Sequence, residues 1–343
     1  MTARVPVAVL GATGTVGQKF VRLLADHPWF ELVAVAASDQ SAGKRYGDAV
    51  RWRETTALPD RIADLVLQPS RPPLEARVVF SALDADVALE IEQAFARAGA
   101  VVVTNTRVHR MEPDVPLMVP EVNGRHVELI EVQRRQRGWS GAILANPNCS
   151  TAALVVALAP LHAAFRLERL FVSTMQAASG AGYPGVPSLD LLGNVIPFIG
   201  GEEEKMEIET RKILDAPELR MTAHCNRVAV VDGHLEVVSA GFKRPPSVDE
   251  AIAAFTAFRG PGLVPTLPSS PEQPVEVDLR PDRPQSRLDA ERGKGMAVTV
   301  GRVRACTLLD LKFALLGHNT IRGAAGAAIQ IAELLQAEGR LAP

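Results

Sequence analysis

Residues 5–17 read Val-Pro-Val-Ala-Val-Leu-Gly-Ala-Thr-Gly-Thr-Val-Gly, and this stretch decides the fold of the first half of the chain. Its apolar, partly β-branched start predicts a buried strand. Gly11, Gly14 and Gly17 follow where the strand turns into a helix that we expect to continue to about Asp26. Glycine at such a turn lets backbone N–H groups approach a pyrophosphate and lets the helix pack closely on the strand. The spacing is GxxGxxG rather than GxGxxG, so a plain glycine-rich turn is the alternative.

Strands and helices alternate after this loop. Further strands are predicted at 31–37, 78–82 and 101–104, with a helix at 86–98 between the last two. This alternation predicts an α/β fold with a doubly wound, Rossmann-like parallel sheet.

The pattern changes after Cys149. Longer strands are expected at 170–176, 220–231, 235–242 and 296–305, and they indicate an α+β second domain. The Pro-rich stretch 260–284 is expected to be a surface excursion. The Ala-rich stretch 324–338 predicts a helix that packs back on the first domain.

Length and composition limit the class of protein. The 343 residues suffice for two domains, and the 47% hydrophobic and 22% charged fractions are typical of a globular protein. A net charge of −2 argues against a general affinity for nucleic acid or an anionic membrane. No apolar run approaches the roughly 20 residues that span a bilayer. Cys149, Cys225 and Cys306 form neither a disulfide framework nor a metal motif, so we expect no metal site and a reducing, cytoplasmic location.

A second motif, Asn-Pro-Asn-Cys-Ser-Thr at 146–151, places Cys149 between two apolar runs. A strand, a turn and a helix start would leave the thiol at a helix N-terminus, where backbone N–H groups and the helix dipole favour the nucleophilic thiolate. Taken alone, the segment also fits a buried, inert cysteine. Cys225 lies in an apparent strand and Cys306 follows one, so we interpret both as packing residues.

The end of the second predicted strand bears on the nucleotide. NAD enzymes usually place a carboxylate there to hold the ribose hydroxyls. Here Ser38 occupies that position, with Ser41, Lys44 and Arg45 close by. Hydroxyls and cations suit a 2′-phosphate, so the sequence favours NADP. Asp39 keeps NAD open.

Several segments together resemble the aspartate-semialdehyde dehydrogenase family, and most of all its archaeal and fungal branch. The segments that carry the resemblance are 11–18, 36–44, 146–151, 176–182, 201–205, 226–234 and 318–326. They span nearly the full length of the chain. Two residues depart from the family pattern, Ala229 within the segment 226–234, where Pro is frequent, and Leu235 directly after it, where Thr is usual. Both flank the site and bear on the choice of substrate.

The resemblance implies a reaction. The family interconverts L-4-aspartyl phosphate and L-aspartate 4-semialdehyde through an enzyme thioester, with hydride passing to or from NADP, in lysine, threonine and methionine biosynthesis. A thioester requires a cysteine thiolate, and Cys149 is the best placed. His234 resembles the catalytic histidine, which would take the thiol proton and manage protons during hydride transfer. Gln176 would orient the thioester or the substrate through its amide.

The resemblance also implies a substrate pocket. Arg227 would hold the substrate carboxylate with its planar two-point fork. Glu202 would meet the ammonium group. Lys205 and Arg110 resemble the phosphate ligands, with Asn148 beside the nucleophile, whereas Glu203 and Glu204 are expected to be solvated.

The expected cofactor-binding residues come from both halves of the chain: Gly11, Thr13, Gly14, Thr15, Val16, Ser38, Ser41, Ser179, Gly180 and Asn319. The resemblance implies a cofactor domain over 1–148 completed by a helix in 320–343. It implies a catalytic and dimerisation domain of the glyceraldehyde-phosphate-dehydrogenase-like type over 149–319. The chain would act as a homodimer or homotetramer.

Two rival functions stay open at this stage. The same scaffold could reduce a related acyl donor such as malonyl-CoA, although a malonyl group has no ammonium for Glu202 to hold. A dinucleotide-sensing protein without enzymatic activity would have no need of Cys149, His234, Arg227 and Glu202 together.

Overall fold

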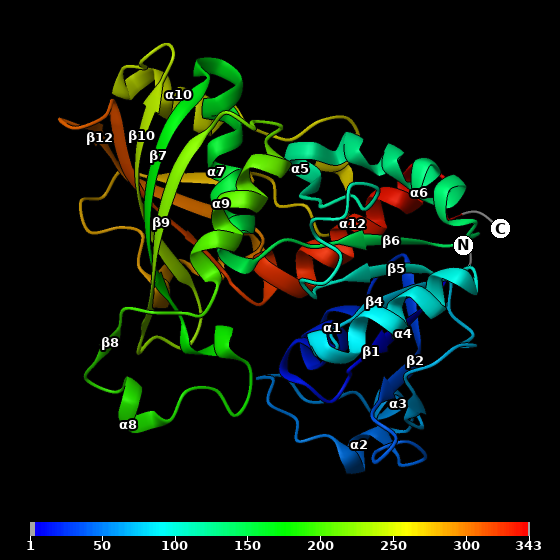
Figure 1. The fold of residues 1–343 in the computed structure, drawn as a ribbon. Coiled ribbons are helices and arrows are strands. Elements are labelled where there is room, and N and C mark those ends of the chain that lie inside the picture. Colours follow the sequence, from blue (N-terminus) through cyan, green and yellow to red (C-terminus); the bar gives the residue numbers. More distant parts are fainter. Residues whose placement is uncertain (1–3, 342–343) are drawn as a thin grey trace.

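Two β-sheets lie side by side in this computed structural model, which describes residues 4–341 (Figure 1). The first sheet has six parallel strands in the order β3-β2-β1-β4-β5-β6. They are β1 (Val5–Leu10), β2 (Phe30–Ala37), β3 (Gln68–Pro69), β4 (Val78–Ser81), β5 (Val101–Thr104) and β6 (Ala142–Ala145). This is the strand order of a doubly wound dinucleotide-binding sheet, so the predicted Rossmann-like architecture is confirmed.

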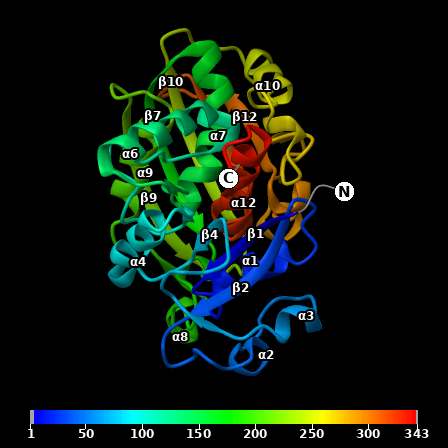
Figure 2. The same cartoon turned by 90° about the vertical axis from the view of Figure 1, so that its right-hand side faces the viewer.

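Helices cover both faces of the first sheet. α1 (Thr15–Leu24), α6 (Leu129–Arg137) and α12 (Gly326–Ala337) pack on one face, and α4 (Ala85–Arg97) packs on the other. Strands buried on both faces form unbroken apolar runs, and every residue of β4, β5 and β6 is buried. Figure 2 shows the C-terminal helix α12 returning to the first sheet, as its Ala-rich sequence predicted.

A long apolar helix, α7 (Cys149–Phe165), connects the two sheets. It begins just after β6 and lies over one face of the second sheet. A helix that is apolar on all sides must be enclosed, and α9 (Glu202–Ile213), α10 (Val248–Ala257) and α5 (Pro120–Asn123) complete that enclosure.

The second sheet has seven strands in the order β11-β12-β13-β10-β7-β9-β8. They are β7 (Leu167–Gln176), β8 (Val195–Ile196), β9 (Arg220–Val228), β10 (His234–Phe242), β11 (Val275–Asp278), β12 (Val298–Ala305) and β13 (Leu311–Gly317). Only β7–β9 and β11–β12 are parallel pairs, so the predicted α+β character is confirmed. The face away from α7 exposes Phe171 and Val237, which are 39% and 40% accessible.

Two expectations about the second half were incomplete. The Pro-rich stretch 260–284 is more than a surface excursion, because Val264 and Leu267 are buried and Val275–Asp278 forms β11. Proline is tolerated beside an edge strand, where β11 lies. β13 was not predicted, because Leu311–Gly317 contains no β-branched residue.

The other elements are short: α2 (Tyr46–Ala49), α3 (Asp60–Ala63), η1 (Gly124–Glu128), η2 (Ala178–Ala181), α8 (Ser188–Leu191), η3 (Val264–Thr266), α11 (Ser286–Asp289), η4 (Arg292–Gly295) and the π-helical turn η5 (Ile321–Ala325). Within residues 4–341, no helix combines the length and the apolar character needed to cross a membrane.

Candidate active site

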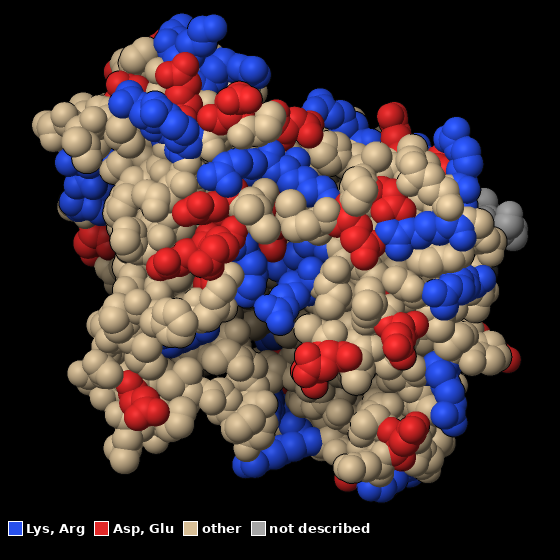
Figure 3. All heavy atoms as spheres, viewed as in Figure 1, with Lys and Arg blue, Asp and Glu red and all other residues tan. Residues whose placement is uncertain are grey.

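The candidate site lies where β6, α7 and the second sheet meet. In the strand register Gln176 of β7 pairs with Arg227 of β9, and Met175 pairs with Leu235, the neighbour of His234. One parallel and one antiparallel ladder therefore bring three distant side chains to one end of the sheet. Figure 3 shows Lys and Arg side chains gathered in the hollow between the two halves of the molecule.

Cys149 is the first residue of α7. Asn148 caps this helix, because its Oδ1 accepts the backbone N–H groups of Ser150 and Thr151 at 3.0 and 3.3 Å. Gly323 of η5 packs directly against the nucleophile. A Cβ at position 323 would stand 2.6 Å from Cys149 Cβ, so only glycine fits there.

The His234 ring is fixed as a donor. Its Nε2 lies 3.2 Å from Cys149 Sγ, and its Nδ1 accepts the backbone N–H of Ala177 at 3.0 Å. In a neutral imidazole, an accepting Nδ1 leaves the proton on Nε2. The ring therefore presents an N–H to the sulfur. The expected role as base for the thiol would require the other tautomer and the loss of the Ala177 contact.

Burial controls the protonation of this pair. Burial raises the pKa of the Cys149 thiol to about 12, with Glu202 acting in the same direction and Arg110 and Arg227 opposing it. Burial, followed by Arg227, lowers the pKa of His234 to about 3. At neutral pH the pair is a thiol beside a neutral imidazole. Burial of the thiol therefore opposes the thiolate that the start of the helix favours.

Arg227 is enclosed at the same end of the sheet. It is 6% exposed, and its Nη1 donates to the carbonyl of Ala177 at 2.8 Å. Gly180 lies directly against it. A Cβ at position 180 would stand 2.8 Å from Arg227 Nη1 and 3.0 Å from His234 Cε1, so a larger residue would push on both side chains.

Glu202 lies at the N-terminus of α9 and contacts Asn148, the residue before Cys149. Its Oε1 accepts a hydrogen bond from Asn148 Nδ2 at 2.5 Å, and its Oε2 lies 3.1 Å from Lys205 Nζ. Gln176 Nε2 is 3.4 Å from the same Oε1. The predicted catalytic and substrate residues thus converge on Cys149.

Arg110 reaches the site from the loop after β5. Its Nη1 donates to Glu209 at 2.9 Å and its Nη2 donates to the carbonyl of Asn105 at 2.8 Å. Its Nε is buried and has no hydrogen-bond partner among residues 4–341. The guanidinium is therefore anchored on one side, with a donor left over.

The sequence reasoning missed two residues on α9. Glu202, Lys205, Glu209 and Lys212 share one face of the helix, at spacings of three, four and three residues. Glu209 contacts Arg110, and Lys212 donates to the carbonyls of the same loop. The helical period of these four charges was the signal that could have revealed them.

A cavity of about 550 Å³ lies at the carboxyl ends of β1 and β2. The glycine loop, Ser38 and Asp39 line it, together with two residues that the sequence reasoning did not select, Ser70 and Arg71. Ser41 does not line this cavity. Its N–H instead donates to the carbonyl of Ser38 in a turn that follows β2.

The remaining predicted cofactor residues do not line this cavity. Thr15 and Ser179 line a second cavity of about 360 Å³, and Val16 follows Thr15 in the first turn of α1. Asn319 Nδ2 donates to Ser179 Oγ at 2.7 Å, and Asn319 Oδ1 accepts the Gly233 N–H at 2.9 Å. Asn319 therefore also fixes the residue just before His234.

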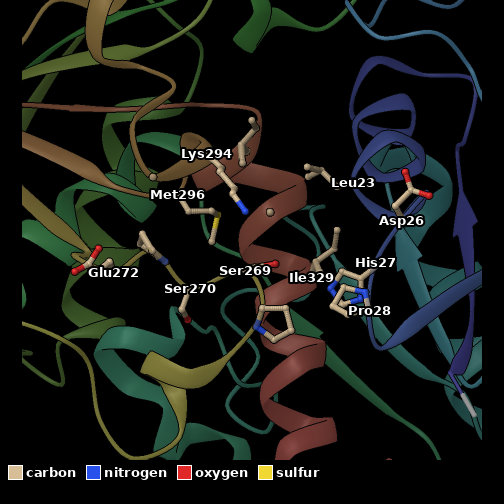
Figure 4. Close-up of a pocket in the computed structure, with 15 residues that line it drawn as sticks. Leu23, Asp26, His27, Pro28, Ser269, Ser270, Glu272, Lys294, Met296 and Ile329 are labelled. Atoms are coloured by element: carbon tan, nitrogen blue, oxygen red, sulfur yellow. The ribbon is translucent and has the colours of Figure 1, made fainter. Parts of the chain in front are cut away.

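A further cavity of about 420 Å³ is separate from this site (Figure 4). Leu23, Pro28, Met296 and Ile329 line it, and none of the predicted site residues does. It belongs to the junction between α1, α12 and the Pro-rich stretch.

Glu236 is an unused acid beneath the site. It lies two residues after His234 on the same face of β10, it is fully buried, and neither carboxyl oxygen has a partner among residues 4–341. Burial raises the pKa of Glu236 well above its ordinary value, which favours the protonated form of this carboxyl group.

We expect Glu236→Gln to stabilise the protein, and to do so more at pH 8 than at pH 5. An unfolded glutamate ionises near pH 4.3, so the free energy of unfolding of the wild type falls by up to about 1.4 kcal/mol per pH unit above that value until the folded pKa is reached. Glutamine has no such dependence. Urea denaturation at both pH values measures the difference, and an equal difference at both would contradict a protonated Glu236.

Two family models match the chain. The model described as "Semialdehyde dehydrogenase, NAD binding domain" covers residues 6–130. The model described as "Semialdehyde dehydrogenase, dimerisation domain" covers residues 158–322. Each match falls on one of the two sheets.

Relatives and solved structures agree with these models. Aspartate-semialdehyde dehydrogenase of Archaeoglobus fulgidus is 50% identical, covering 97% of this chain and 98% of its own. The Candida albicans enzyme, solved with NADP, superposes with a TM-score of 0.91 at 44% identity, covering 98% and 99% of the two chains. A Vibrio cholerae enzyme, solved with ASA, gives a TM-score of 0.80 at 27% identity, covering 98% and 99%. The chain belongs to the aspartate-semialdehyde dehydrogenase family.

Proposed function

We propose that the chain catalyses the reversible, NADP-dependent reductive dephosphorylation of L-4-aspartyl phosphate to L-aspartate 4-semialdehyde through a thioester on Cys149. The observation that carries this proposal is the 3.2 Å contact between Cys149 Sγ and His234 Nε2 at the start of α7. Arg227 and Glu202 beside it supply one cation and one anion, as an α-amino acid requires.

The residues of this chain support each part of that chemistry. The Cys149 thiol gives up its proton to the departing phosphate as its sulfur attacks the acyl carbon, and the bond from that carbon to the phosphate oxygen breaks. His234 Nε2–H donates to the oxyanion that forms on that carbon. Arg110, Lys205 and Asn148 hold the departing phosphate. NADPH supplies the hydride that reduces the thioester to the aldehyde and frees Cys149.

Several features of the glycine loop fit a bound dinucleotide. α1 starts without a side-chain cap, and Thr15 Oγ1 is buried with no partner among residues 4–341. A Cβ on Gly11 would stand 2.5 Å from the carbonyl oxygen of Ala82, so the loop can only approach this closely with glycine. A helix N-terminus with free N–H groups suits a pyrophosphate. Ser38, Ser70 and Arg71 favour the 2′-phosphate of NADP over NAD.

We expect Arg71→Ala to raise the KM for NADP by about tenfold, which corresponds to one charge-assisted hydrogen bond. The KM for NAD should hardly change, since NAD has no 2′-phosphate. Steady-state kinetics with both cofactors measure this, with Lys44→Ala as the control because Lys44 does not line the cavity. An equal rise in the KM for both cofactors would show that Arg71 does not contact the 2′-phosphate.

We expect Arg227→Lys to lower kcat/KM for the semialdehyde by about a hundredfold, with the fold intact. Lysine keeps the charge but loses the two-point fork, so the carboxylate rotates and the reacting carbon moves away from Cys149. A displacement of about 1 Å costs about that much. Steady-state kinetics and circular dichroism measure the two properties. If Arg227→Lys left kcat/KM unchanged, the substrate would instead be an acyl donor without the amino-acid head, such as malonyl-CoA.

The second sheet supports a proposal about the assembly. Its face away from α7 is open and bears exposed Phe171 and Val237, and the matching family model is a dimerisation domain. We propose a homodimer or homotetramer, with a cofactor domain over 1–148 and 320–343 and a catalytic domain over 149–319. The free thiols of Cys149, Cys225 and Cys306 suit a reducing cytoplasm.

A substrate panel tests the proposed function. NADP reduction should depend on phosphate and should be much faster with L-aspartate 4-semialdehyde than with succinate or glutamate semialdehyde. Succinate semialdehyde lacks the ammonium group, and glutamate semialdehyde is longer by one carbon. Equal rates with succinate semialdehyde would show that Glu202 does not recognise the ammonium group of the substrate.

A further inference from the structure

We propose that Glu209 is a positioning residue that fixes the phosphate-binding Arg110 relative to the start of the nucleophile's helix. This inference rests on the proposed function, since that function assigns phosphate to Arg110. Glu209 itself would touch neither substrate nor cofactor.

One buried carboxylate joins the two parts. Glu209 is 1% exposed. Its Oε1 accepts a hydrogen bond from Arg110 Nη1 at 2.9 Å, and its Oε2 accepts the backbone N–H of Asn148 at 2.6 Å. A buried carboxylate held by a guanidinium and a backbone amide has little freedom to move. The distance between its two partners is thereby set.

Each partner leads to a different part of the reaction. Asn148 carries the cap of α7, so its position determines where Cys149 stands. Arg110 has two contacts, to Glu209 and to Asn105, while its buried Nε has no partner among residues 4–341. These two contacts fix the orientation of the guanidinium, and with it the direction of the remaining Nε donor. The phosphate that leaves the acyl carbon must contact this Arg110 donor while the Cys149 sulfur bonds to that carbon.

A second contact keeps the surrounding loop in place. Lys212, three residues after Glu209, donates from Nζ to the carbonyls of Arg110, Glu112 and Val115 at 2.7, 2.9 and 3.2 Å. Loss of the Glu209 carboxylate should therefore free the guanidinium without releasing the loop. This division separates positioning from folding.

The test is Glu209→Gln. Glutamine can still accept the Asn148 N–H, but its amide N–H groups would face the guanidinium of Arg110, donor against donor. The KM for inorganic phosphate should rise about tenfold to a hundredfold, as expected for a cation displaced by about 1 Å. The KM for the semialdehyde and for NADP should change less than about twofold. Glu207→Gln, on the same helix but partly exposed beside Arg211, is the matched control.

A double-mutant cycle with Arg110→Gln completes the test. If Glu209 acts through Arg110, Glu209→Gln adds no further rise in the phosphate KM in the Arg110→Gln background. Additive effects, an unchanged or lower phosphate KM, or an equal loss in all three KM values would overturn the inference. If Glu209→Gln does not fold, Glu209→Asp, which keeps the charge but reaches only one partner, must show the same selective rise.

A measurement without aldehyde or cofactor separates this inference from the proposed function. Inorganic phosphate should slow the alkylation of Cys149 by iodoacetamide in the wild type. The phosphate concentration for half-protection should be at least tenfold higher in Glu209→Gln and unchanged in Glu207→Gln. Identical protection in all three proteins would overturn the role of Glu209, whatever the semialdehyde panel shows.

Discussion

Replacing Cys149 by serine should lower kcat by at least about 10⁴-fold while cofactor binding stays intact. A hydroxyl is a far weaker nucleophile than a thiolate, and removing the nucleophile of an enzyme that uses covalent catalysis costs several orders of magnitude. A packing defect at one small side chain could not cause such a loss. Steady-state kinetics give kcat, and fluorescence titration gives the affinity for NADPH.

The other two cysteines are the controls. Cys225 is buried beside Met206, and its Sγ lies 3.6 Å from the methionine sulfur. Cys306 lies in the turn between β12 and β13. Cys225→Ser and Cys306→Ser should each retain wild-type kcat within about twofold. Full activity in Cys149→Ser, or inactivation of Cys306→Ser, would overturn the assignment of the nucleophile.

Replacing His234 by asparagine should lower kcat by about 10²- to 10³-fold, the usual cost of removing an oxyanion donor. The KM for the semialdehyde should change little, because His234 contacts the reacting centre rather than the amino-acid head. The fixed tautomer of His234 leads to a second expectation, which concerns the pH dependence of kcat. With the pKa of His234 lowered to about 3 by burial, kcat should show no titration of this ring between pH 5 and 8.

The pH profile distinguishes a donor from a base. A base would lose activity as the ring becomes protonated, with an inflection near its pKa. An inflection near pH 6.5 that disappears in His234→Asn would show that the ring titrates during turnover, and it would restore the role expected from the sequence.

The first sheet could be predicted because its strands and its glycine loop depend on residues that are neighbours in the sequence. Parallel strands buried on both faces, such as Val78–Ser81 and Val101–Thr104, form short apolar runs that a sequence displays directly. The glycine loop is equally local, since Gly11 needs its left-handed backbone conformation with φ of 68°. The prediction that Cys149 is the nucleophile rests on the residues that surround it in sequence together with the family resemblance.

The electrostatics of the site could not be predicted in this way. The helix N-terminus favours a thiolate, yet the pKa of Cys149 is raised because distant segments enclose it. The tautomer of His234 depends on the Ala177 N–H, which comes from another strand end. Each of these effects depends on contacts between segments far apart in the chain.

The acidic start of α9 also could not be interpreted from the sequence alone. A run of charges is usually a solvated face, and Glu204 is indeed exposed. Glu202 was identified only through the family resemblance, and Glu209 was missed although it is 1% exposed. The helical spacing that places both on one face was present in the sequence. What the sequence lacked was the position of Arg110, whose charge makes a buried carboxylate favourable at that point.

The measurement that tests the central claim most directly is the intact mass of the enzyme after mixing with L-aspartate 4-semialdehyde and NADP in the absence of phosphate. Our account predicts one aspartyl group attached as a thioester to Cys149, one NADPH formed per active site, and loss of the adduct when phosphate is added. NADPH formation without an adduct, or an adduct on any residue other than Cys149, would contradict it.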